Sequence, residues 1–413
     1  MALLVLKFGG TSVGSPERIR IVAERIARER RAGHQVVVVV SAMGHTTDEL
    51  MALAKSVTPD ARRRHPRELD MLLTAGERIA MALTAMAIRD CGVEAISLTG
   101  SQAAIITDET HTGARIQEVR ATRVREELER GCVVIVAGFQ GVSRTREVTT
   151  LGRGGSDTTA VALAAALSAD RCDIFTDVAG VYTADPRRVP AARLIERLDY
   201  QEMVEMATSG AQVMHPRAVE IGARFGVPIR VLSSFQDGDQ RGTLITRVPR
   251  MSMEELALSG LASESGYVRL TLRGLPTGMD AVTELLTRLA DAKVSVDMVV
   301  LADRADRRRQ IQVTIQEDVL PDALAVCESL TEGLHGEQIV VQRGLSRVAL
   351  VGSGMHGAPG VFARAFQALR ADGIEVHALG TSAVTIAFLV STPDEERTLQ
   401  ALHRAFDLER EVP

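Results

Sequence analysis

The stretch that decides the fold lies near the N-terminus, where residues 3–16 read LLVLKFGGTSVGSP. Its first part, Leu3–Phe8, predicts a buried strand, because strands covered on both faces are rich in Val, Ile and Leu. Ser15 and Pro16 predict a helix start, since Ser caps helices and Pro is favoured at the first helical position. The glycines between predict a turn whose backbone N–H groups face a helix N-terminus, which favours phosphate.

The same alternation of apolar run and helical pattern continues to about residue 245. Only 3% of the residues are aromatic and Trp is absent, so the cores must be aliphatic. Repeated strand–helix alternation predicts a mostly parallel sheet between layers of helices. Further strands are predicted at Val36–Val40, Val133–Ala137, Ile174–Thr176 and Ile229–Leu232, and an Ala-rich helix at Ala160–Leu167.

The C-terminal part of the chain repeats itself. Val268 recurs as Val348 and Leu289 as Leu369, each with an offset of 80 residues. Each copy reads strand, helix, strand, strand, helix, strand, and such small units bury their sheet faces by packing together. We therefore predict an N-terminal α/β domain over 1–246, a linker over 247–264, and two α+β modules over 265–343 and 344–413.

Bulk properties exclude several classes of protein. The 413 residues carry a net charge of −5 and no RRM, zinc-finger or basic-zipper pattern, so nucleic acid is not an expected partner. The four cysteines form no C-x-x-C pair. We find no signal peptide and no stretch that approaches a membrane span, so we expect no membrane partner and a location in the reducing cytoplasm.

Polar and Gly-rich clusters follow several predicted strands. Lys7 precedes the glycines of the first turn, so this is not a Walker A loop, in which Lys follows them. Residues 150–159, TLGRGGSDTT, contain Arg153 and Asp157, which a purely structural turn would not need. Arg can grip a carboxylate through two parallel hydrogen bonds. Three more clusters read SAMGHTT (41–47), TAGER (74–78) and TDVAGVYTADPR (176–187).

In this order, VLKFGGTSVG, SAMGHTT, TAGER, GFQG, TLGRGGSDTT and TDVAGVYTADPR resemble the motifs of aspartate kinases in the amino-acid-kinase superfamily. The duplicated tail resembles their tandem ACT domains, so the likeness spans nearly the whole chain. The resemblance implies a three-layer α/β/α sandwich followed by two ferredoxin-like ACT modules. It also implies phosphorylation of the L-aspartate side chain by ATP with Mg²⁺, the first step towards lysine, threonine and methionine.

The resemblance assigns roles by position. Lys7 would contact the transferring phosphoryl oxygens, and Asp157 would organise Lys7 and the metal–phosphate region. Arg153 would hold the substrate α-carboxylate and Glu77 its α-ammonium, and no metal ligand is assigned to the chain. The remaining substrate-facing residues would be Ser41, Thr47, Phe139 and Ser156. The nucleotide-facing residues would be Gly9, Gly10, Thr176, Asp177, Tyr182, Asp185, Arg187 and Gln212.

The chemistry agrees with these roles. The nucleophilic carboxylate has a pKa near ~4 and is already ionised, so it needs no general base. Catalysis then reduces to in-line positioning and charge neutralisation. Gln212 departs from the family, which usually has Lys there. Losing that cation could cost ~2–4 kcal/mol of transition-state stabilisation, but we favour the interpretation that Lys7 and Mg²⁺ suffice.

The sensing modules also depart from the family. The second copy keeps Pro359 and Gly360 at its loop-to-helix turn, whereas the first copy has Met279 and Asp280. The usual S-T-S-E segment of the second copy contains Thr381 and Ser382 but reads GTSA. We expect these positions to face effectors, and we hypothesise weakened or altered feedback by lysine and threonine.

Two alternatives stay open: a kinase of another acidic amino acid, and a catalytically weak, amino-acid-sensing partner subunit. The ACT-like modules predict a homodimer or a higher homo-oligomer. Met251 and Met253 would permit an internal start that yields a separate regulatory subunit, although we favour the interpretation that they are ordinary linker residues.

Overall fold

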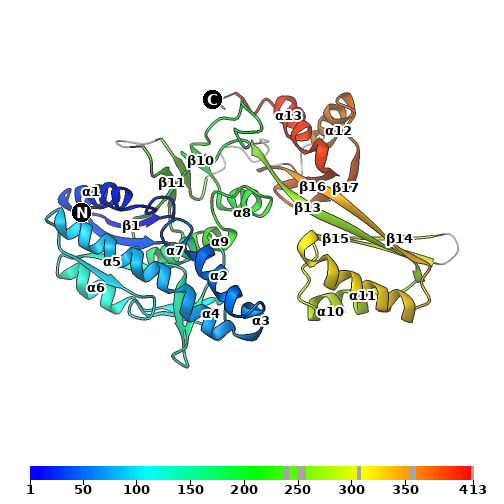
Figure 1. Cartoon of the computed structure of the whole chain (residues 1–413). Coiled ribbons are helices and arrows are strands. Elements are labelled where there is room, and N and C mark those ends of the chain that lie inside the picture. Colours follow the sequence, from blue (N-terminus) through cyan, green and yellow to red (C-terminus); the bar gives the residue numbers. More distant parts are fainter. Residues whose placement is uncertain (237–240, 249–256, 305–307, 354, 356–359, 411–413) are drawn as a thin grey trace. The chain divides into compact units, whose positions relative to one another are not determined.

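The structure is a computed structural model that describes residues 1–236, 241–248, 257–304, 308–353, 355 and 360–410. The chain forms two compact units, each built from two segments. The first unit holds Met1–Tyr182 and Leu194–Met253, and the second holds Thr183–Arg193 and Glu254–Pro413. The mixed α/β class that we predicted is confirmed (Figure 1).

The first unit is built on an eight-stranded sheet in the order β10-β12-β11-β9-β1-β2-β6-β3. The strands from β11 to β3 run parallel, whereas β12 is antiparallel to β11. Parallel strands end at the same edge, so the loops after β1, β2, β6 and β9 emerge together. The strands are β1 (Leu3–Phe8), β2 (Gln35–Val40), β3 (Ala95–Leu98), β6 (Val133–Ala137), β9 (Arg171–Thr176), β10 (Arg197–Leu198), β11 (Ile229–Ser233) and β12 (Thr243–Ile245).

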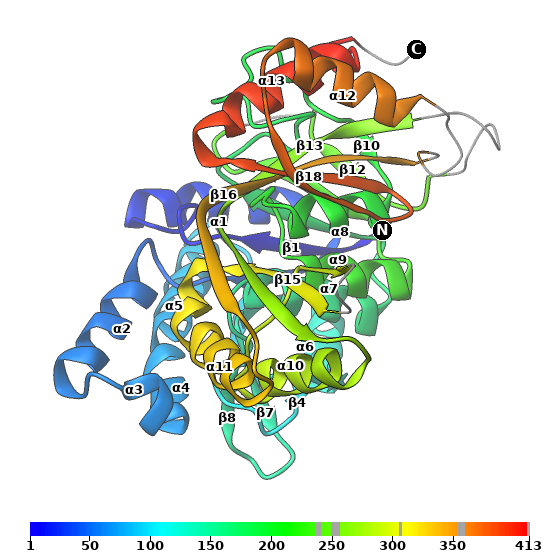
Figure 2. The ribbon, with the colours of Figure 1, turned by 90° about the vertical axis from the view of Figure 1, so that its right-hand side faces the viewer.

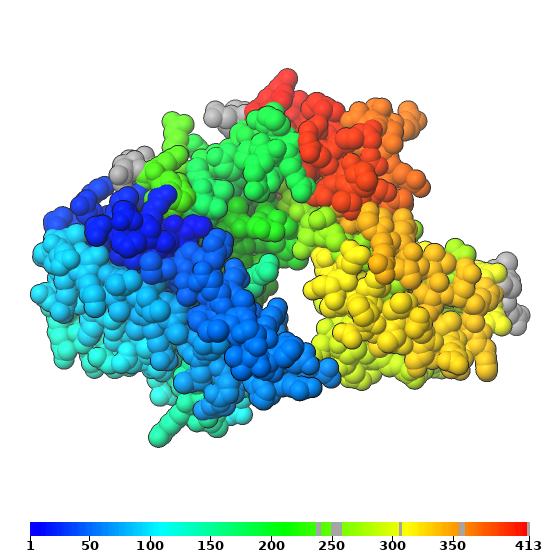
Figure 3. Space-filling model, viewed as in Figure 1, coloured from blue at the N-terminus to red at the C-terminus, as the bar shows by residue number. Residues whose placement is uncertain are grey.

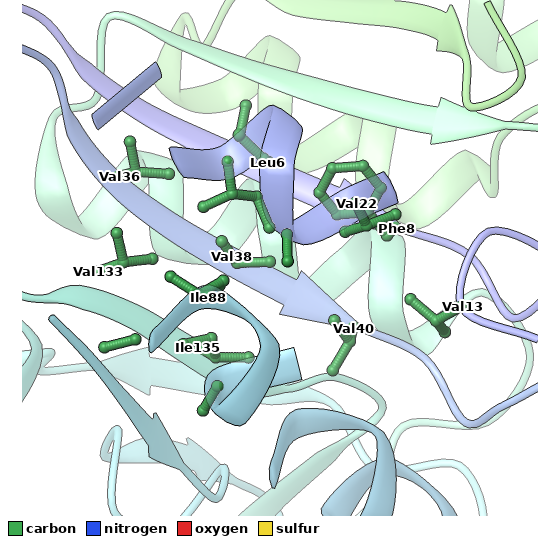
Figure 4. Packing of buried hydrophobic residues seen from close by; sticks show 14 of the residues in the cluster. Leu6, Phe8, Val13, Val22, Val36, Val38, Val40, Ile88, Val133 and Ile135 are labelled. Carbon is green, nitrogen blue, oxygen red and sulfur yellow. The ribbon is translucent and has the colours of Figure 1, made fainter. Parts of the chain in front are cut away.

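Helices cover both faces of this sheet. On one face, side chains of α1 and α5 such as Val22 and Ile88 join Leu6 and Val38 in a buried core (Figure 4). The alternate residues, such as Val37, are also fully buried, and α7 packs against β1, β2 and β9. The helices are α1 (Pro16–Arg31), α2 (Thr46–Val57), α3 (Ala61–Arg64), α4 (Pro66–Leu73), α5 (Ala75–Asp90), α6 (Thr122–Glu129), α7 (Gly155–Leu167), α8 (Tyr200–Thr208) and α9 (Pro216–Phe225).

The stretch that opens the chain folds as expected. β1 has the predicted bounds, and α1 begins at Pro16 with Ser15 as its N-cap, whose side chain accepts a hydrogen bond from the Arg18 backbone N–H. A four-stranded sheet in the order β5-β4-β7-β8 was not predicted. Its strands are β4 (Ile105–Thr107), β5 (Ile116–Val119), β7 (Gln140–Ser143) and β8 (Val148–Thr150).

One helical stretch corrects our expectation that nothing approaches a membrane span. Pro66–Asp90 runs for 25 residues through α4 and α5 and is apolar enough to cross a membrane by length and composition alone. Half of its apolar window is buried within the protein. Ala80 and Ile88 are fully buried in the core of the first unit, so this apolar face is used for packing.

The second unit contains a six-stranded sheet in the order β14-β15-β13-β16-β18-β17. Helices α10 and α11 pack together over one half, and α12 and α13 over the other (Figure 2). Figure 3 shows them as a yellow and an orange-to-red region. The elements are β13 (Ala257–Pro276), α10 (Asp280–Asp291), β14 (Met298–Asp303), β15 (Arg308–Gln316), η1 (Glu317–Val319), α11 (Leu320–Gly333), β16 (Gln338–Ser353), α12 (Val361–Ala371), β17 (Val376–Thr381), β18 (Thr385–Ser391), η3 (Thr392–Asp394) and α13 (Glu395–Ala405).

Part of the segment that we predicted as a linker is a strand in the sheet of this unit. Residues 249–256 of the predicted linker lie outside the described residues, but 257–264 form the first part of β13 and pair with 347–353 of β16. The second module ends with α13 and not with the final strand that the repeat pattern predicted. Residues 257–264, which precede the first module in the chain, supply the edge strand of its sheet instead. The first module is therefore inserted between two parts of the second.

Candidate functional site

The carboxyl edge of the eight-stranded sheet gathers most of the predicted site. The turn after β1 and the loop after β2 are joined by a hydrogen bond from the Gly44 N–H to the Gly10 carbonyl, at 3.0 Å. Gly10 is required here, because a Cβ would lie 2.9 Å from the Ala42 carbonyl oxygen. Ser41 begins the loop after β2 and Thr47 lies in the first turn of α2, both half-buried. Two predicted substrate-facing positions thus border the first turn.

A buried ion pair links β1 to the start of α7. Lys7 Nζ lies 2.7 Å from Asp157 Oδ1, and both side chains are about nine-tenths buried, with 11% and 12% exposed. Asp157 is in the first turn of α7, where unpaired backbone N–H groups favour negative charge. Gly9 leaves room beside the ammonium, since a Cβ there would lie 3.4 Å from Lys7 Nζ. A cation and a helix N-terminus therefore meet at one point, a combination suited to phosphate.

Glu77 is the most perturbed carboxyl group at this edge. It is 3% exposed, and its Oε1 accepts a hydrogen bond from the Ala42 N–H at 3.2 Å. Its Oε2 is buried without a hydrogen-bond partner among the described residues. Burial raises the pKa of Glu77 from 4.5 to about 7, against the smaller lowering effect of backbone hydrogen bonds. Such a group can receive a cationic ligand.

The glycines of the TLGRGGSDTT loop allow close packing. A Cβ on Gly154 would lie 2.2 Å from His215 Cβ, and one on Gly155 would lie 2.9 Å from the Phe139 ring. Phe139 itself has a left-handed backbone with φ of 67°, a strained conformation for a non-Gly residue. Arg153 is exposed and has no hydrogen bond or ion pair within the described part of the chain. The loop therefore holds its backbone firmly while presenting a guanidinium group.

Ser156 completes the predicted substrate side. Its side chain is 8% exposed, in the first turn of α7. A Cβ on Gly138 would approach Ser156 Oγ to 2.6 Å, so the loop after β6 lies directly on this helix end.

A buried aspartate that we did not predict supports the same loop. Asp70 in α4 is fully buried and accepts hydrogen bonds from the Thr150 hydroxyl at 2.6 Å and the Thr112 N–H at 3.1 Å. His111 Nδ1 lies 2.7 Å from its other oxygen. Arg217 in α9 donates to the Leu151 carbonyl at 2.8 Å. The carboxylate and the guanidinium thus hold the two residues that precede the Gly-rich turn.

The predicted nucleotide-facing residues fall into three groups. Thr176 ends β9 and donates a hydrogen bond to Asp177. Tyr182 is half-buried in the first unit, whereas Asp185 and Arg187 belong to the second unit. There the Arg187 guanidinium donates hydrogen bonds to the Asp185 carboxylate at distances from 2.8 to 3.2 Å. These bonds lower the pKa of Asp185. Gln212 is exposed in the turn before α9, and its role stays a prediction.

Two of the predicted effector positions, Met279 and Gly360, lie at equivalent places, the N-caps of α10 and α12. Met279, 63% exposed, is the N-cap of α10, and Asp280 is its first residue. Gly360, with φ of 105°, is the N-cap of α12. Thr381 ends β17 and Ser382 follows it, both exposed. Pro359 lies outside the described residues, as do Met251 and Met253.

Comparisons with known proteins place this geometry in a family. Residues 2–233 match the amino acid kinase family, and residues 348–406 match an ACT domain. The aspartokinase of Geobacillus stearothermophilus is 45% identical over 415 residues, which cover 100% of this chain and 99% of that protein. Aspartokinase 2 of Bacillus subtilis is 44% identical over 410 residues, 99% of each protein.

Solved structures give the same result. Escherichia coli aspartokinase III in complex with aspartate and ADP has a TM-score of 0.82 and 28% identity, covering 98% of this chain and 100% of that one. The same enzyme in complex with lysine and aspartate has a TM-score of 0.74 at 28% identity, covering 97% and 99%. The chain belongs to the aspartokinases of the amino acid kinase family.

Proposed function

We propose that the carboxyl edge of the eight-stranded sheet is where this aspartokinase transfers the γ-phosphoryl group of ATP to the side-chain carboxylate of L-aspartate. The products are 4-phospho-L-aspartate and ADP. The observation that carries the proposal is the buried Lys7–Asp157 pair at the N-terminus of α7, with 2.7 Å between Nζ and Oδ1. In this pair the Asp157 carboxylate fixes the position of the Lys7 ammonium, and the ammonium is the group that would neutralise negative charge on the phosphoryl oxygens.

The substrate side of the proposal rests on two groups of opposite charge. Arg153 presents an exposed guanidinium that has no hydrogen bond or ion pair among the described residues, and it suits the α-carboxylate of aspartate through two parallel hydrogen bonds. Glu77 has a buried oxygen without a hydrogen-bond partner among the described residues, and this oxygen suits the α-ammonium. Together they would fix both ends of the amino-acid backbone and leave the side-chain carboxylate free to attack. The pocket would be completed by Ser41, Thr47, Phe139 and Ser156.

The nucleotide side would use the turn of Gly9 and Gly10 for the phosphates. The remaining contacts would come from Thr176, Asp177, Tyr182, Asp185, Arg187 and Gln212. Kinases use the nucleotide with a divalent metal, and we propose Mg²⁺. The described residues contain no group of three or more His, Cys, Asp or Glu that could hold a metal ion. Mg²⁺ binds through few carboxylates together with substrate phosphates, so it does not require such a group. When bound, it would neutralise phosphate charge, with Asp157 and Asp177 as the available carboxylates.

The chain's own residues then act by position and charge. Aspartate needs no base, because its side-chain carboxylate is ionised at neutral pH. Lys7 would stabilise the charge on the phosphoryl oxygens, and Asp157 would hold the ammonium in place through the 2.7 Å contact. The packed Gly-rich loop would keep Arg153 in one orientation towards the substrate.

Steady-state kinetics with coupled ADP detection test the proposal. Purified protein should turn over aspartate with ATP, and glutamate and N-acetylglutamate should give at most a small fraction of that rate. Preference for another acidic amino acid would transfer the proposal to that substrate. Binding of ATP and aspartate without turnover would favour the alternative of a sensing partner subunit.

We further propose weakened or altered feedback in the ACT modules. The first module has Met279 and Asp280 where the second has Pro359 and Gly360, and the Thr381–Ser382 segment lacks the usual acidic residue. Lysine is bound in one E. coli aspartokinase III structure, and we propose to assay it together with threonine, the second effector that we expect. Inhibition by either at submillimolar concentration would contradict this proposal.

We also propose a cytoplasmic homodimer or higher homo-oligomer formed through the ACT modules, with an internally started subunit permitted by Met251 and Met253.

A further inference from the structure

The predicted substrate arginine, Arg153, sits on a backbone that cannot fix its direction by itself. It lies between Gly152 and Gly154, which have left-handed φ angles of 75° and 69°. A glycine that is not held populates many backbone conformations, because it has no Cβ to restrict it. Contacts from outside the loop must therefore decide where the Arg153 side chain points.

One guanidinium supplies such contacts from the start of α9. Arg217 donates from Nη1 to the Leu151 carbonyl at 2.8 Å and from Nη2 to the Ala114 carbonyl at 2.9 Å. Leu151 and Ala114 are fully buried, so water cannot readily replace a lost donor. Leu151 precedes Arg153 by two residues. The two-pronged contact of Arg217 thus ties the entry of the Gly-rich loop to the segment around residue 114.

Backbone hydrogen bonds extend this contact to a third segment of the chain. The Ala114 N–H donates to the Thr150 carbonyl at 2.9 Å, and the Leu151 N–H donates to the Phe139 carbonyl at 2.8 Å. The entry of the loop is therefore held by the segments around residues 114 and 139 and by α9. The contact from α9 is made by a side chain, so a substitution can remove it without changing the backbone.

The start of α9 also contacts the loop on the other side of Arg153. The N-cap of this helix, His215, accepts a hydrogen bond through Nδ1 from the Arg217 N–H at 3.3 Å. Burial lowers the pKa of His215, so at neutral pH the ring is uncharged and Nδ1 can accept. The His215 side chain packs against Gly154, where an added Cβ would lie 2.2 Å from His215 Cβ. One helix start therefore holds the residues before and after Arg153.

We infer that Arg217 is a positioning residue for the amino-acid substrate: by holding Leu151 and Ala114 it sets the direction of the Arg153 guanidinium towards the substrate α-carboxylate. The inference rests on the proposed role of Arg153. All four residues belong to the first unit. A planar guanidinium grips a carboxylate through two bonds only when it is correctly aimed, and a displacement of about 1 Å can cost about 100-fold in rate.

The phosphate side of the site is held by other contacts. The Lys7 ammonium is placed by β1 and by its contact with Asp157 at 2.7 Å. The glycine turn after β1 is placed by the hydrogen bond between Gly10 and Gly44. Loss of Arg217 should therefore weaken the use of aspartate and leave the KM for ATP nearly unchanged.

Steady-state kinetics of the full-length protein test this inference with two substitutions of graded severity. Arg217→Lys keeps the charge, but its single ammonium cannot reproduce the two-pronged contact. Arg217→Met removes the charge as well. We expect kcat/KM for aspartate to fall about 10-fold in Arg217→Lys and about 100-fold in Arg217→Met, with the KM for ATP within about twofold of the wild-type value. Arg217→Lys is the milder variant in case Arg217→Met does not fold.

The matched control is Arg224→Met on the same helix. Arg224 is exposed and lies over the Phe225 ring, 5.7 Å from its centroid. This variant loses the same charge and should leave kcat/KM for aspartate and the KM for ATP unchanged. A wild-type kcat/KM for aspartate in the folded Arg217 variants would overturn the inference. An equal rise in the KM of both substrates would also overturn it, since that pattern marks general destabilisation.

Double variants separate positioning from a merely structural role. If Arg217 acts through Arg153, adding either Arg217 substitution to Arg153→Lys should lower kcat/KM for aspartate by less than about threefold further, because the two effects are coupled. Fully additive losses would show that Arg217 acts elsewhere, and would overturn the inference.

The single Arg153→Lys variant distinguishes this inference from the proposed substrate role. If Arg153→Lys lowers kcat/KM for aspartate and the Arg217 variants do not, the positioning by Arg217 is wrong and the substrate role stands. If Arg153→Lys leaves kcat/KM for aspartate unchanged, the substrate role of Arg153 is itself wrong and the inference fails with it.

Discussion

The perturbed pKa of Glu77 predicts that aspartate binding is coupled to loss of a proton. Burial raises this pKa from 4.5 to about 7 in the protein without substrate. At pH 6 the group is then about nine-tenths protonated, and at pH 8 about one-tenth. Binding of the substrate α-ammonium beside the buried oxygen favours the charged form and removes the proton. Aspartate should therefore bind about tenfold more weakly at pH 6 than at pH 8.

Isothermal titration calorimetry measures both quantities. The binding enthalpy, recorded in buffers with different ionisation enthalpies, should show release of about 0.9 proton at pH 6 and about 0.1 at pH 8. Glu77→Gln should bind aspartate weakly and without coupled proton release. An affinity that stays constant between pH 6 and 8, with no proton release, would refute the assignment of the ammonium to Glu77.

The same pKa makes a prediction for stability. A buried carboxyl whose folded-state pKa is raised binds its proton more tightly in the native state, so the free energy of unfolding falls as pH rises from 4.5 to about 7. At about 1.4 kcal/mol per pH unit, the full loss is about 3 kcal/mol above pH 7. Relative to the wild type, Glu77→Gln should gain about this much between pH 4.5 and 8 in denaturant titrations. Parallel pH profiles would contradict the calculation.

Three further substitutions test other parts of the site. Lys7→Met should lower kcat about 100- to 1,000-fold in the coupled assay, and a kcat near wild type would exclude Lys7 from phosphoryl transfer. Asp70→Asn should lower the free energy of unfolding by about 2–4 kcal/mol and raise the KM for aspartate, whereas Glu68→Gln, on the exposed face of the same helix, should change neither. Gln212→Lys should change kcat by less than about threefold, because the position is exposed and a charge there is screened; a tenfold gain would show that the missing cation matters.

The strands and the order of the site motifs could be predicted from the sequence because they are local. The run Val36–Val40 can bury both faces only in a central strand, and it forms most of β2. The combination of glycines with Arg153 and Asp157 predicts a ligand loop, and this role stays a prediction. The unit boundary between Tyr182 and Thr183 was not predictable, because it depends on contacts with residues more than 200 positions away, such as His403.

The errors have physical causes of the same kind. Asp70 lies in an ordinary amphipathic helix, and only its contact with Thr150, 80 residues away, reveals its role. Residues 257–264 are rich in Ala, Ser and Gly, which have little tendency to form strands, and pairing with β16 decides their structure. Tertiary contacts thus override local preference at both places.

The nesting of one regulatory module inside the other has a consequence for the order of folding. The edge strand of the second module, residues 257–264, leaves the ribosome 83 to 96 residues before the partner with which it pairs. Closing so long a loop costs conformational entropy before any contact repays it. β13 and β16 also pair within the first module, so folding of that module already brings the two strands together in register. We therefore infer that the first module folds first and acts as the nucleus for the second. The helix layer of the second module is complete only when α13 has been synthesised.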